Sequence, residues 1–523
     1  MPDEQLLSAA KNHKLTVIDF PRPSIMLKYI LSLMAGSLLT LAFAPFNLPA
    51  LAILSLLLFL KLVDSAGNTS AAVKTGFAFG LGFYTTSFYW VYITLFYYGH
   101  FHYLLASSLT ILLSMTLSSF TAVNALLLTK LNSGRGNLKY LIIFPGTWTL
   151  LEWVRSWILS GFPWQLLSQA SLDTPLEFYL PIVGSFGTGF IICLITGCIY
   201  CLLQNPPNKL RYLFISIILF SPGIMFKDIN WTTIEDEPIK VTGIQFNIEP
   251  DDKMYFFRSD TFHDEIIEDT FSQEPGSIVV WPESAIMEPY QNIPNYISNL
   301  IKLSKEKDIS LISGVTSNAD NIYRNQFRIY YNSMMIIEDG SLQLYGKHKL
   351  VPMGDYIPFG TEINKLFFNY SLPMSNFRPD KPNQAPVFVK NRPFLPIICF
   401  EVIFGEIVRR EIVTKNSQFI INVSEDGWFR KTAEPAQHLQ IAQVRALENG
   451  RYLIRVTNRG HSALIDSHGK IITQSKLFVK DIIKGEIFPV SGATPYMLIG
   501  SAPILSIIFL LIVITTRRKK SAI

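Results

Sequence analysis

The sequence predicts a membrane α-helical bundle of about eight spans, joined to one soluble domain in which sheets are sandwiched between helices. Residues 24–227 are almost continuously apolar, residues 228–488 have the composition of an ordinary soluble domain, and residues 494–516 are apolar again. Charged residues make up 16% of the 523-residue chain, against about 25% in typical soluble proteins. Part of the chain is therefore expected to lie in lipid. The weak excess of Lys and Arg over Asp and Glu, 45 to 40, does not indicate a nucleic-acid partner.

A helix that spans a bilayer needs about 20 mostly apolar residues. Such segments occur in the first half of the chain and once near its end, at roughly 25–44, 48–63, 73–97, 102–129, 139–161, 178–204, 212–227 and 494–516. The second and the seventh are the shortest. No small-residue cleavage site follows the polar N-terminal residues 1–24, so these are not expected to form a cleavable signal peptide.

The distribution of basic residues predicts the orientation of these spans. Lys and Arg occur in the N-terminal tail, in the second, fourth and sixth connections and in the C-terminal "RRKK", whereas the first, third and fifth connections contain none. Both termini are therefore expected on the cytoplasmic side of a bacterial inner membrane. The expected parts are a tail with seven transmembrane helices (1–227), a periplasmic domain (228–488), and an eighth transmembrane helix with a basic cytoplasmic tail (489–523).

In the soluble domain, predicted strands alternate with predicted helices. The expected strands are 239–248, 277–284, 309–317, 330–338, 394–401, 418–424, 452–458 and 462–472, and the expected helices are 263–273, 296–307, 404–415 and 435–450. Several strands are apolar without alternation, which indicates that both faces of the sheets are covered. The length suits a single domain.

Polar residues interrupt the ends of three predicted strands. Glu283 ends "IVVWPES", Cys399 and Glu401 end "LPIICFE", and Lys347 and Lys349 follow a strand in "YGKHKLVPMGDYIP". In α/β sheets, ligands gather at the carboxyl ends of strands. If these ends converge, the carboxylate can take the thiol proton, the thiolate can attack a carbonyl, and an ammonium can hold the oxyanion. The alternative is that these are three unrelated groups.

Cys399 is the only cysteine of the soluble domain, since Cys193, Cys198 and Cys201 lie in the apolar first half. In the oxidising periplasm, structural cysteines are normally paired, and Cys399 has no partner in its own domain. A lone thiol in this compartment is expected to be either a small buried hydrophobe or a group that the protein uses.

Glu152 and Arg155 lie three residues apart in the fifth predicted span and share one helix face. Charges within lipid usually face the protein interior and are paired. Two interpretations remain open: a structural ion pair that fixes helix packing, or the lining of a groove for a lipid or acyl chain. In the second case, Trp164 of "GFPW" (161–164) is expected at the outer membrane interface.

The segments around the glutamate, lysine and cysteine together resemble the nitrilase, or carbon–nitrogen hydrolase, superfamily. The whole chain resembles a membrane-embedded branch of it, the apolipoprotein N-acyltransferase family, and the order and spacing of the motifs make this resemblance specific. The matching motifs are "APFN" (44–47), "GFPW" (161–164), "WPES" (281–284), "GKHKLVPMGDYIPFG" (346–360), "CFE" (399–401), "WF" (428–429), "QHLQIAQVRALENGR" (437–451), "TNRG" (457–460) and "TPY" (494–496).

The resemblance implies an exported α-β-β-α sandwich of nitrilase type and a role for each matched residue. Glu283 is expected to be the general base, Lys347 the oxyanion-stabilising lysine and Cys399 the nucleophile. Glu401 is expected to orient Lys347 or the incoming amine. Asp355 stands where the family usually has Glu, and a hydrogen bond to Lys347 is its expected supporting role. The resemblance implies no metal and no cofactor.

Three further residues depart from the family pattern. Arg430 stands where a small residue is usual, Arg459 where Asn is expected, and Phe400 where Tyr is common. We interpret these departures as changes in lipid or lipoprotein preference, not in the reaction. The apolar stretch 364–377 and the pair Trp428–Phe429 are either lipid-facing loops or ordinary packing.

The function implied by the resemblance is acyl transfer in lipoprotein maturation. Cys399 would take a fatty acyl chain from a phospholipid as a thioester and pass it to the α-amino group of the S-diacylglyceryl-cysteine of an apolipoprotein. The expected partners are the membrane and these two lipid substrates, and the expected state is a monomer. One alternative is a membrane-tethered amidase acting on a small amide, which needs only one or two spans. The other is a non-enzymatic transporter or sensor, which has no need of three reactive groups at strand ends.

Overall fold

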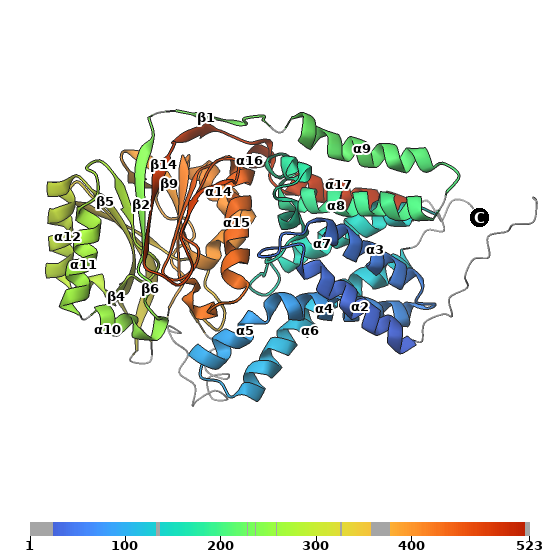
Figure 1. Cartoon of the computed structure of the whole chain (residues 1–523), viewed down its shortest axis with the longest axis horizontal. Coiled ribbons are helices and arrows are strands. Elements are labelled where there is room, and N and C mark those ends of the chain that lie inside the picture. The colour runs from blue at the N-terminus through green and yellow to red at the C-terminus, as the bar shows by residue number, and fades with distance from the viewer. Residues whose placement is uncertain are drawn as a thin grey trace, which may run out of the picture.

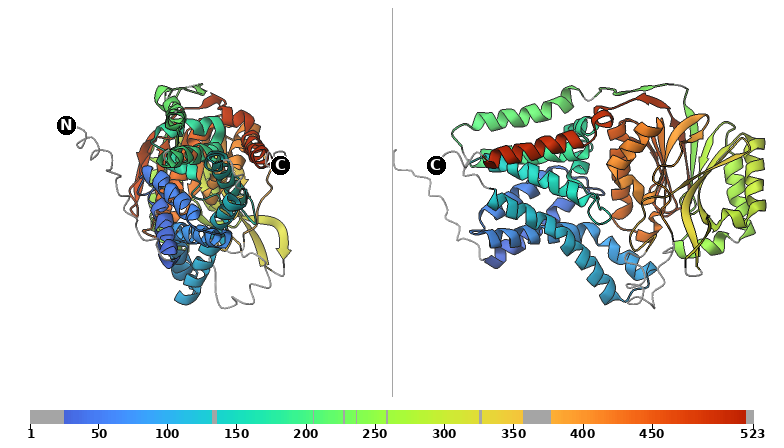
Figure 2. Two further views of the ribbon diagram at one scale, coloured as in Figure 1. Left: turned by 90° about the vertical axis from the view of Figure 1, so that its right-hand side faces the viewer. Right: turned by 180° about the vertical axis from the view of Figure 1, so that it is seen from behind.

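The computed structural model describes residues 25–131, 136–204, 206–226, 228–235, 237–257, 259–324, 327–356 and 377–517. A helical part and an α/β part lie side by side along the long axis of the molecule (Figure 1), and the view from behind shows the same arrangement (Figure 2). Helices α14 (Gly405–Lys415) and α15 (Glu434–Asn449) lie where the two parts meet.

Each segment predicted to span the membrane forms helix. The helices of this part are α2 (Ile25–Thr40), α3 (Ala50–Asp64), α4 (Thr69–Phe88), α5 (Trp90–Ile93), α6 (Tyr103–Lys130), α7 (Phe144–Arg155), α8 (Leu180–Leu203), α9 (Lys209–Met225), α16 (Pro495–Ile499) and α17 (Ala502–Arg517). Within the described residues, α6 and the helical stretch Pro175–Leu203 are long and apolar enough to cross a membrane by length and composition, and α2 and α17 are shorter apolar helices.

The helices of this part pack closely through small and aromatic residues. A Cβ added at Gly36 on α2 would lie 1.8 Å from the carbonyl oxygen of Phe79 on α4, so only glycine allows this approach. Deeper in the core, the rings of Phe59 and Trp148 meet edge to face with centroids 6.0 Å apart, a favourable aromatic geometry.

The α/β part contains two sheets that pack face to face. The first has the order β14-β2-β3-β5-β6-β7, with β4 beside β5, and the second has the order β13-β12-β11-β10-β9-β8. Buried aliphatic side chains of both sheets, such as Val280 and Val423, form the core between them.

The strands of the first sheet are β2 (Ile239–Gln245), β3 (Ile278–Val280), β4 (Ile286–Pro289), β5 (Ser310–Arg324), β6 (Phe327–Glu338), β7 (Ser341–Gly346) and β14 (Asp481–Ile487). Those of the second are β8 (Val387–Val389), β9 (Arg392–Ile398), β10 (Phe419–Ser424), β11 (Leu453–Thr457), β12 (Ala463–Ile465) and β13 (Ile471–Gln474).

Helices cover the outer faces of both sheets and complete an α-β-β-α sandwich (Figure 1). Helices α11 (Asp260–Phe271) and α12 (Pro294–Lys307) pack on the first sheet, and α14 and α15 cover the second sheet on the side of the helical part. Helix α15 has Pro435 in its first turn and ends at Gly450, whose φ of 56° is the left-handed conformation common at helix ends.

Strand directions decide which turns can meet. Strands β2, β3 and β5 are parallel, and because β6 is antiparallel to both β5 and β7, β7 runs in the same direction as β5. In the second sheet, β9, β10 and β11 are parallel. The segments after β3 and β7 therefore leave from one edge of the first sheet, and those after β9 and β10 from one edge of the second.

Two predicted strands that carry candidate site residues are shorter than expected. The predicted strand 277–284 stops with β3, because Pro282 has no N–H to donate to a ladder, and Glu283 lies in the turn that follows. The predicted strand 394–401 stops at Ile398, because the next residues fold into a 3-10 turn.

A third predicted strand, 462–472, is two strands. Strands β12 and β13 are separated by a tight turn in which the Gly469 N–H donates to the Asp466 carbonyl at 3.0 Å. Strand β7 was expected only as the strand before Lys347, without bounds, and strands β4, β8 and β14 were not predicted. A further pair, β1 (Thr232–Ile234) and β15 (Val490–Gly492), forms a separate two-stranded ladder.

Candidate active site

Three segments that follow strands meet in one place. The turn after β3 carries Glu283, the segment after β7 carries Lys347, and the 3-10 turn after β9 begins with Cys399. The Nζ of Lys347 lies 3.2 Å from Oε1 of Glu283, and the Cys399 thiol interacts electrostatically with both side chains. Lys349 takes another direction, with its Nζ 5.3 Å from the centre of the Phe404 ring.

Lys347 is held as a buried cation. Its side chain is 1% exposed, and its Nζ lies 2.8 Å from Oδ2 of Asp355. Burial lowers the pKa of Lys347, but the carboxylates of Asp355 and Glu283 outweigh burial, so the pKa lies well above its usual value. An ammonium is therefore present where an oxyanion can form. The expected contact between Asp355 and Lys347 exists.

Cys399 begins its turn in a conformation that is rare for a residue with a side chain. Its φ is 51°, a strained left-handed backbone of a kind that costs about 1–3 kcal/mol and clusters at functional sites. Cys399 is partly exposed, whereas the other residues of the turn are buried. Desolvation by the surrounding protein and the Glu283 carboxylate raise the pKa of the Cys399 thiol well above its usual value. The resting thiol is therefore neutral and needs a base to become a thiolate.

Glu283 is positioned by residues on neighbouring elements. Asn332 on β6 donates from Nδ2 to Oε1 of Glu283 at 2.7 Å, and Lys253 on α10 (Lys253–Phe257) donates to the Glu283 carbonyl at 2.9 Å. A Cβ added at Gly314 on β5 would lie 2.6 Å from the Glu283 Cα. The other carboxylate oxygen, Oε2, is buried and has no hydrogen-bond partner among the described residues. That oxygen can accept a proton.

Glu401 connects the cysteine turn to the lysine segment. Its Oε2 accepts from the Ile398 N–H at 2.9 Å, and its Oε1 accepts from the N–H groups of His348 at 2.9 Å and Lys349 at 3.1 Å. Burial raises the pKa of Glu401, but the imidazole of His348 and these N–H donors outweigh it, so the pKa is lowered. Glu401 therefore holds the backbone that follows Lys347.

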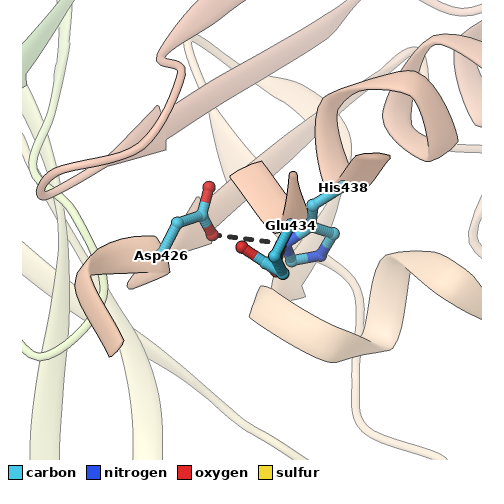
Figure 3. Close-up of side chains that lie close together, drawn as sticks. All are labelled: Asp426, Glu434 and His438. Carbon is cyan, nitrogen blue, oxygen red and sulfur yellow. Dashed lines mark hydrogen bonds and ion pairs between the residues drawn. The ribbon is translucent and has the colours of Figure 1, made fainter. Parts of the chain in front are cut away.

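A second buried cluster lies beside Cys399 and was not predicted. Asp426, from the loop after β10, and Glu434 and His438, from the start of α15, converge there (Figure 3). The Nδ1 of His438 lies 3.2 Å from Oδ1 of Asp426 and 3.3 Å from Oε1 of Glu434. Ser424 hydrogen-bonds the Cys399 thiol and donates to Oδ1 of Asp426 at 2.8 Å. The cluster is thus linked to the thiol through one hydroxyl.

The residue types of this cluster can hold a metal ion, but an arginine lies among them. Arg455 donates from Nη2 to Oδ2 of Asp426 at 2.8 Å and lies 3.0 Å from Nδ1 of His438. Burial raises the pKa of Asp426, but Arg455 and His438 outweigh it and the pKa is lowered. Burial and the Asp426 carboxylate raise the pKa of Glu434 to about 7. We therefore interpret the cluster as a buried ion network that fixes the loop after β10 to α15.

Glu152 and Arg155 are both buried on α7 and their charges interact, but the hydrogen bonds described for them go to the backbone of another segment. Arg155 donates from Nη1 to the carbonyls of Phe162 at 2.8 Å and Trp164 at 2.7 Å, and Glu152 accepts from the Leu167 N–H at 2.9 Å. Buried backbone groups of the irregular segment after α7 need these partners. The cavity beside the two charges measures about 20 Å³, which is room for a water and not for an acyl chain.

The tryptophans expected near lipid lie between the two parts of the molecule. Trp164 is 2% exposed and donates from Nε1 to Oε1 of Gln437 on α15 at 3.0 Å, so it is not at an exposed interface. Trp428 packs edge-on against Tyr98, with ring centroids 5.1 Å apart. The apolar stretch 364–376 lies outside the described residues.

Sequence reasoning missed several residues that support the site. Asp426 and His438 lie within or beside motifs that were recognised, and an acid two residues after a predicted buried strand was the available signal. Asn332 and Gly314 gave no signal, because contacts across a sheet depend on strand pairing that the local pattern does not specify.

The two-sheet sandwich and the grouped Glu, Lys and Cys define a domain of the carbon–nitrogen hydrolase class, joined to an apolar helical part. Residues 249–495 match the family model for carbon-nitrogen hydrolases, and residues 35–198 match that for the apolipoprotein N-acyltransferase N-terminal domain. The chain belongs to the apolipoprotein N-acyltransferase family.

Individual relatives cover nearly the whole chain. The apolipoprotein N-acyltransferase of Coxiella burnetii is 34% identical, with 93% of this chain and 99% of the relative aligned. That of Azotobacter vinelandii is 32% identical, with 92% of this chain and 93% of the relative aligned. The solved structure of Nit3 from Saccharomyces cerevisiae, a member of the nitrilase superfamily, is 20% identical over 49% of this chain and 93% of its own, with a TM-score of 0.36.

Proposed function

We propose that this chain transfers a fatty acyl chain from a phospholipid to the α-amino group of the S-diacylglyceryl-cysteine of an apolipoprotein, and so completes lipoprotein maturation. The observation that carries the proposal is the convergence of Glu283, Lys347 and Cys399 in a member of this acyltransferase family. The surroundings of these groups suit their roles. The carboxylates beside Lys347 keep it charged, and Oε2 of Glu283 has no hydrogen-bond partner among the described residues.

In the first half-reaction, Oε2 of Glu283 takes the thiol proton and the Cys399 thiolate attacks the ester carbonyl of the phospholipid. The Lys347 ammonium stabilises the oxyanion of the tetrahedral intermediate. When this intermediate collapses, the bond to the glycerol oxygen breaks and Glu283 returns the proton to that oxygen. Lysophospholipid leaves, and the acyl chain stays on Cys399 as a thioester.

In the second half-reaction, the free amine of the apolipoprotein attacks the thioester carbonyl. Glu283 takes a proton from the attacking nitrogen, Lys347 again holds the oxyanion, and the carbon–sulfur bond breaks. The products are an N-acyl amide and the Cys399 thiol, which regains its proton from Glu283. The site returns to its starting state without a cofactor.

We further propose that the helical part spans the inner membrane eight times and places residues 228–488 in the periplasm. Support comes from the helices observed at each predicted span and from the alternation of basic residues between connections. All three reacting groups come from one chain, so a monomer suffices.

The proposal is tested by exposing the purified protein to phospholipid without an acceptor. The peptide that contains Cys399 should gain the mass of one fatty acyl chain, and neutral hydroxylamine should release it because the bond is a thioester. A diacylglyceryl-cysteine peptide with a free amino terminus should clear the adduct as an amide. The same peptide with an acetylated amino terminus should leave the adduct in place.

Variants separate the roles of the three groups. Cys399→Ala should form no adduct, Glu283→Gln should form it very slowly, and Lys347→Ala should lose about a hundred- to a thousandfold in rate, as is usual for an oxyanion donor. Normal transfer by Cys399→Ala would refute the covalent route. A protein that ignored phospholipid and hydrolysed small soluble amides would be the membrane-tethered amidase, a reading that the match of residues 35–198 does not favour.

A further inference from the structure

A cavity of about 620 Å³ lies between the helical part and the α/β part. Its walls are the carboxyl ends of α2 and α4, the loop after α2, and the segment 431–433 that leads into α15. None of the residues proposed above to react or to bind the oxyanion lines it. Its volume is that of an ordinary ligand site.

The floor of this cavity is apolar and open. Met34 and Leu38 lie one turn apart on α2, and Leu41 and Phe46 come from the loop that follows. Met34 is 60% exposed and Phe46 is 51% exposed. Because α2 is proposed to span the membrane, these exposed side chains face lipid acyl chains.

The opposite wall carries a cation and hydroxyl donors. Lys431 and Thr432 line it from the α/β part and Tyr89 from the end of α4, and no acidic residue lines the cavity among the described residues. The Tyr89 hydroxyl accepts from the Ala433 N–H at 3.1 Å, so its own proton is free to donate. The Thr432 hydroxyl likewise accepts from the Glu434 N–H at 3.4 Å. A lysine with two hydroxyl donors suits a phosphate group.

We propose that this cavity binds a glycerophospholipid, with an acyl chain over Met34, Leu38 and Phe46 and the phosphate at Lys431, Tyr89 and Thr432. A diacylglyceryl-cysteine acceptor fits less well, because it carries no phosphate and Lys431 repels its amine, which is cationic before it reacts. The use of this lipid as the acyl donor rests on the proposed function. Its binding in the cavity does not.

One segment that lines the cavity is close in sequence to residues beside the candidate active site. The segment 431–433 continues directly into α15, which begins with Glu434 and carries His438 one turn later. His438 contacts Asp426, which Ser424 links to the Cys399 thiol. The cavity wall is therefore connected to the candidate site through the start of α15 and the buried cluster.

The test is photo-crosslinking of the full-length protein in nanodiscs with a phosphatidylglycerol that carries a diazirine in its acyl chain. The label should appear on the peptide that contains Met34 to Phe46.

Lys431→Ala should lower labelling about fivefold, the effect expected for one lysine facing an anionic lipid, and Lys431→Glu should lower it further. Lys431→Arg should retain it. Leu38→Trp should block labelling by filling the floor, and Lys302→Glu, an exposed lysine on α12, is the matched control that should change nothing.

Cys399→Ala should be labelled like the parent protein, because binding does not need the thiol. If the peptide is labelled but phospholipid forms no thioester on Cys399, the proposed function is refuted and the cavity assignment is retained. Labelling confined to other peptides, or unchanged in Lys431→Glu and Leu38→Trp, would overturn the cavity assignment. Competition by a diacylglyceryl-cysteine peptide as strong as that by unlabelled phospholipid would also overturn it, since the occupant would then be the acceptor.

Discussion

The Nζ of Lys347 lies 2.8 Å from Oδ2 of Asp355, and both side chains are buried. The same Asp355 oxygen accepts from the Val351 N–H at 2.8 Å, which fixes the carboxylate in place. Asp355 thus sets both the direction and the charge of the proposed oxyanion-binding lysine.

Asp355→Asn should lower kcat about ten- to a hundredfold with little change in KM, because the interaction that it weakens is made in the transition state. Asp355 raises the pKa of Lys347, so its loss lowers that pKa and should shift the alkaline limb of the pH–rate profile to lower pH. Asp355→Glu restores the charge and should recover most activity. A profile that does not move in Asp355→Asn would separate Asp355 from Lys347.

Glu401→Gln should slow thioester formation and lower the melting temperature together. The carboxylate accepts three backbone N–H bonds, and hydrogen bonds to a charged group contribute about 1.5–3 kcal/mol each. Lys349→Ala is the control, since it leaves the Lys349 N–H bond to Glu401 intact. Mass spectrometry of the adduct and thermal unfolding check both effects; a Glu401→Gln protein with normal rate and stability would exclude the connecting role.

Gly314→Ala should reduce activity through Glu283 without touching a reacting group. The added Cβ would lie 2.5 Å from the Ser284 N and 2.6 Å from the Glu283 Cα, so the turn must move, at a cost of about 1–3 kcal/mol for overpacking. Ser313→Ala, one residue earlier on β5, adds no atom and should be much milder. Equal rates of thioester formation in the two variants would contradict this account.

Glu434→Gln should change how stability depends on pH. The pKa of Glu434 is raised from 4.5 to about 7 by burial and by Asp426. Between these values the folded protein binds more protons than the unfolded chain, so Glu434 makes the protein lose stability as pH rises from about 4.5 to 7. Melting temperatures measured across this window should decline less in Glu434→Gln. An unchanged slope would show that Glu434 titrates normally.

The membrane topology can be checked with a reporter that folds only in the periplasm. Fusion at about residue 300 should give signal, and fusion after Lys520 should not, because the basic connections are expected on the cytoplasmic side. The reverse pattern would overturn the proposed orientation and the lipoprotein substrate with it.

Local pattern was sufficient for most of the secondary structure, and it brought out the candidate groups, whose expected roles came from the family resemblance. Apolar runs located helices such as α6 and α8, and apolar strands bounded by polar turns located β10 and β11 within one residue at each end, whereas β5 extends seven residues beyond its predicted end. Glu283 and Cys399 each follow a buried strand, whereas Lys347 follows β7, whose first residues are exposed or half-buried. Ligands gather at the carboxyl ends of strands, which made all three positions candidates.

Other features depend on contacts between distant segments. Glu401 binds the Ile398 N–H and two N–H groups more than 50 residues away, so β9 ends early and Cys399 takes its strained turn. Arg155 and Glu152, whose charges interact, both hydrogen-bond backbone groups of the segment after α7.

The sequence by itself therefore indicated the division into apolar helices and an α/β sandwich and the chemical types of the candidate groups, because these follow from the order of apolar and polar residues along the chain. Only the tertiary structure decided which partner each buried polar group takes. Burial removes water as a partner, so most such groups bind what the fold brings near, as Asp426 does with Arg455, whereas Oε2 of Glu283 has no hydrogen-bond partner among the described residues.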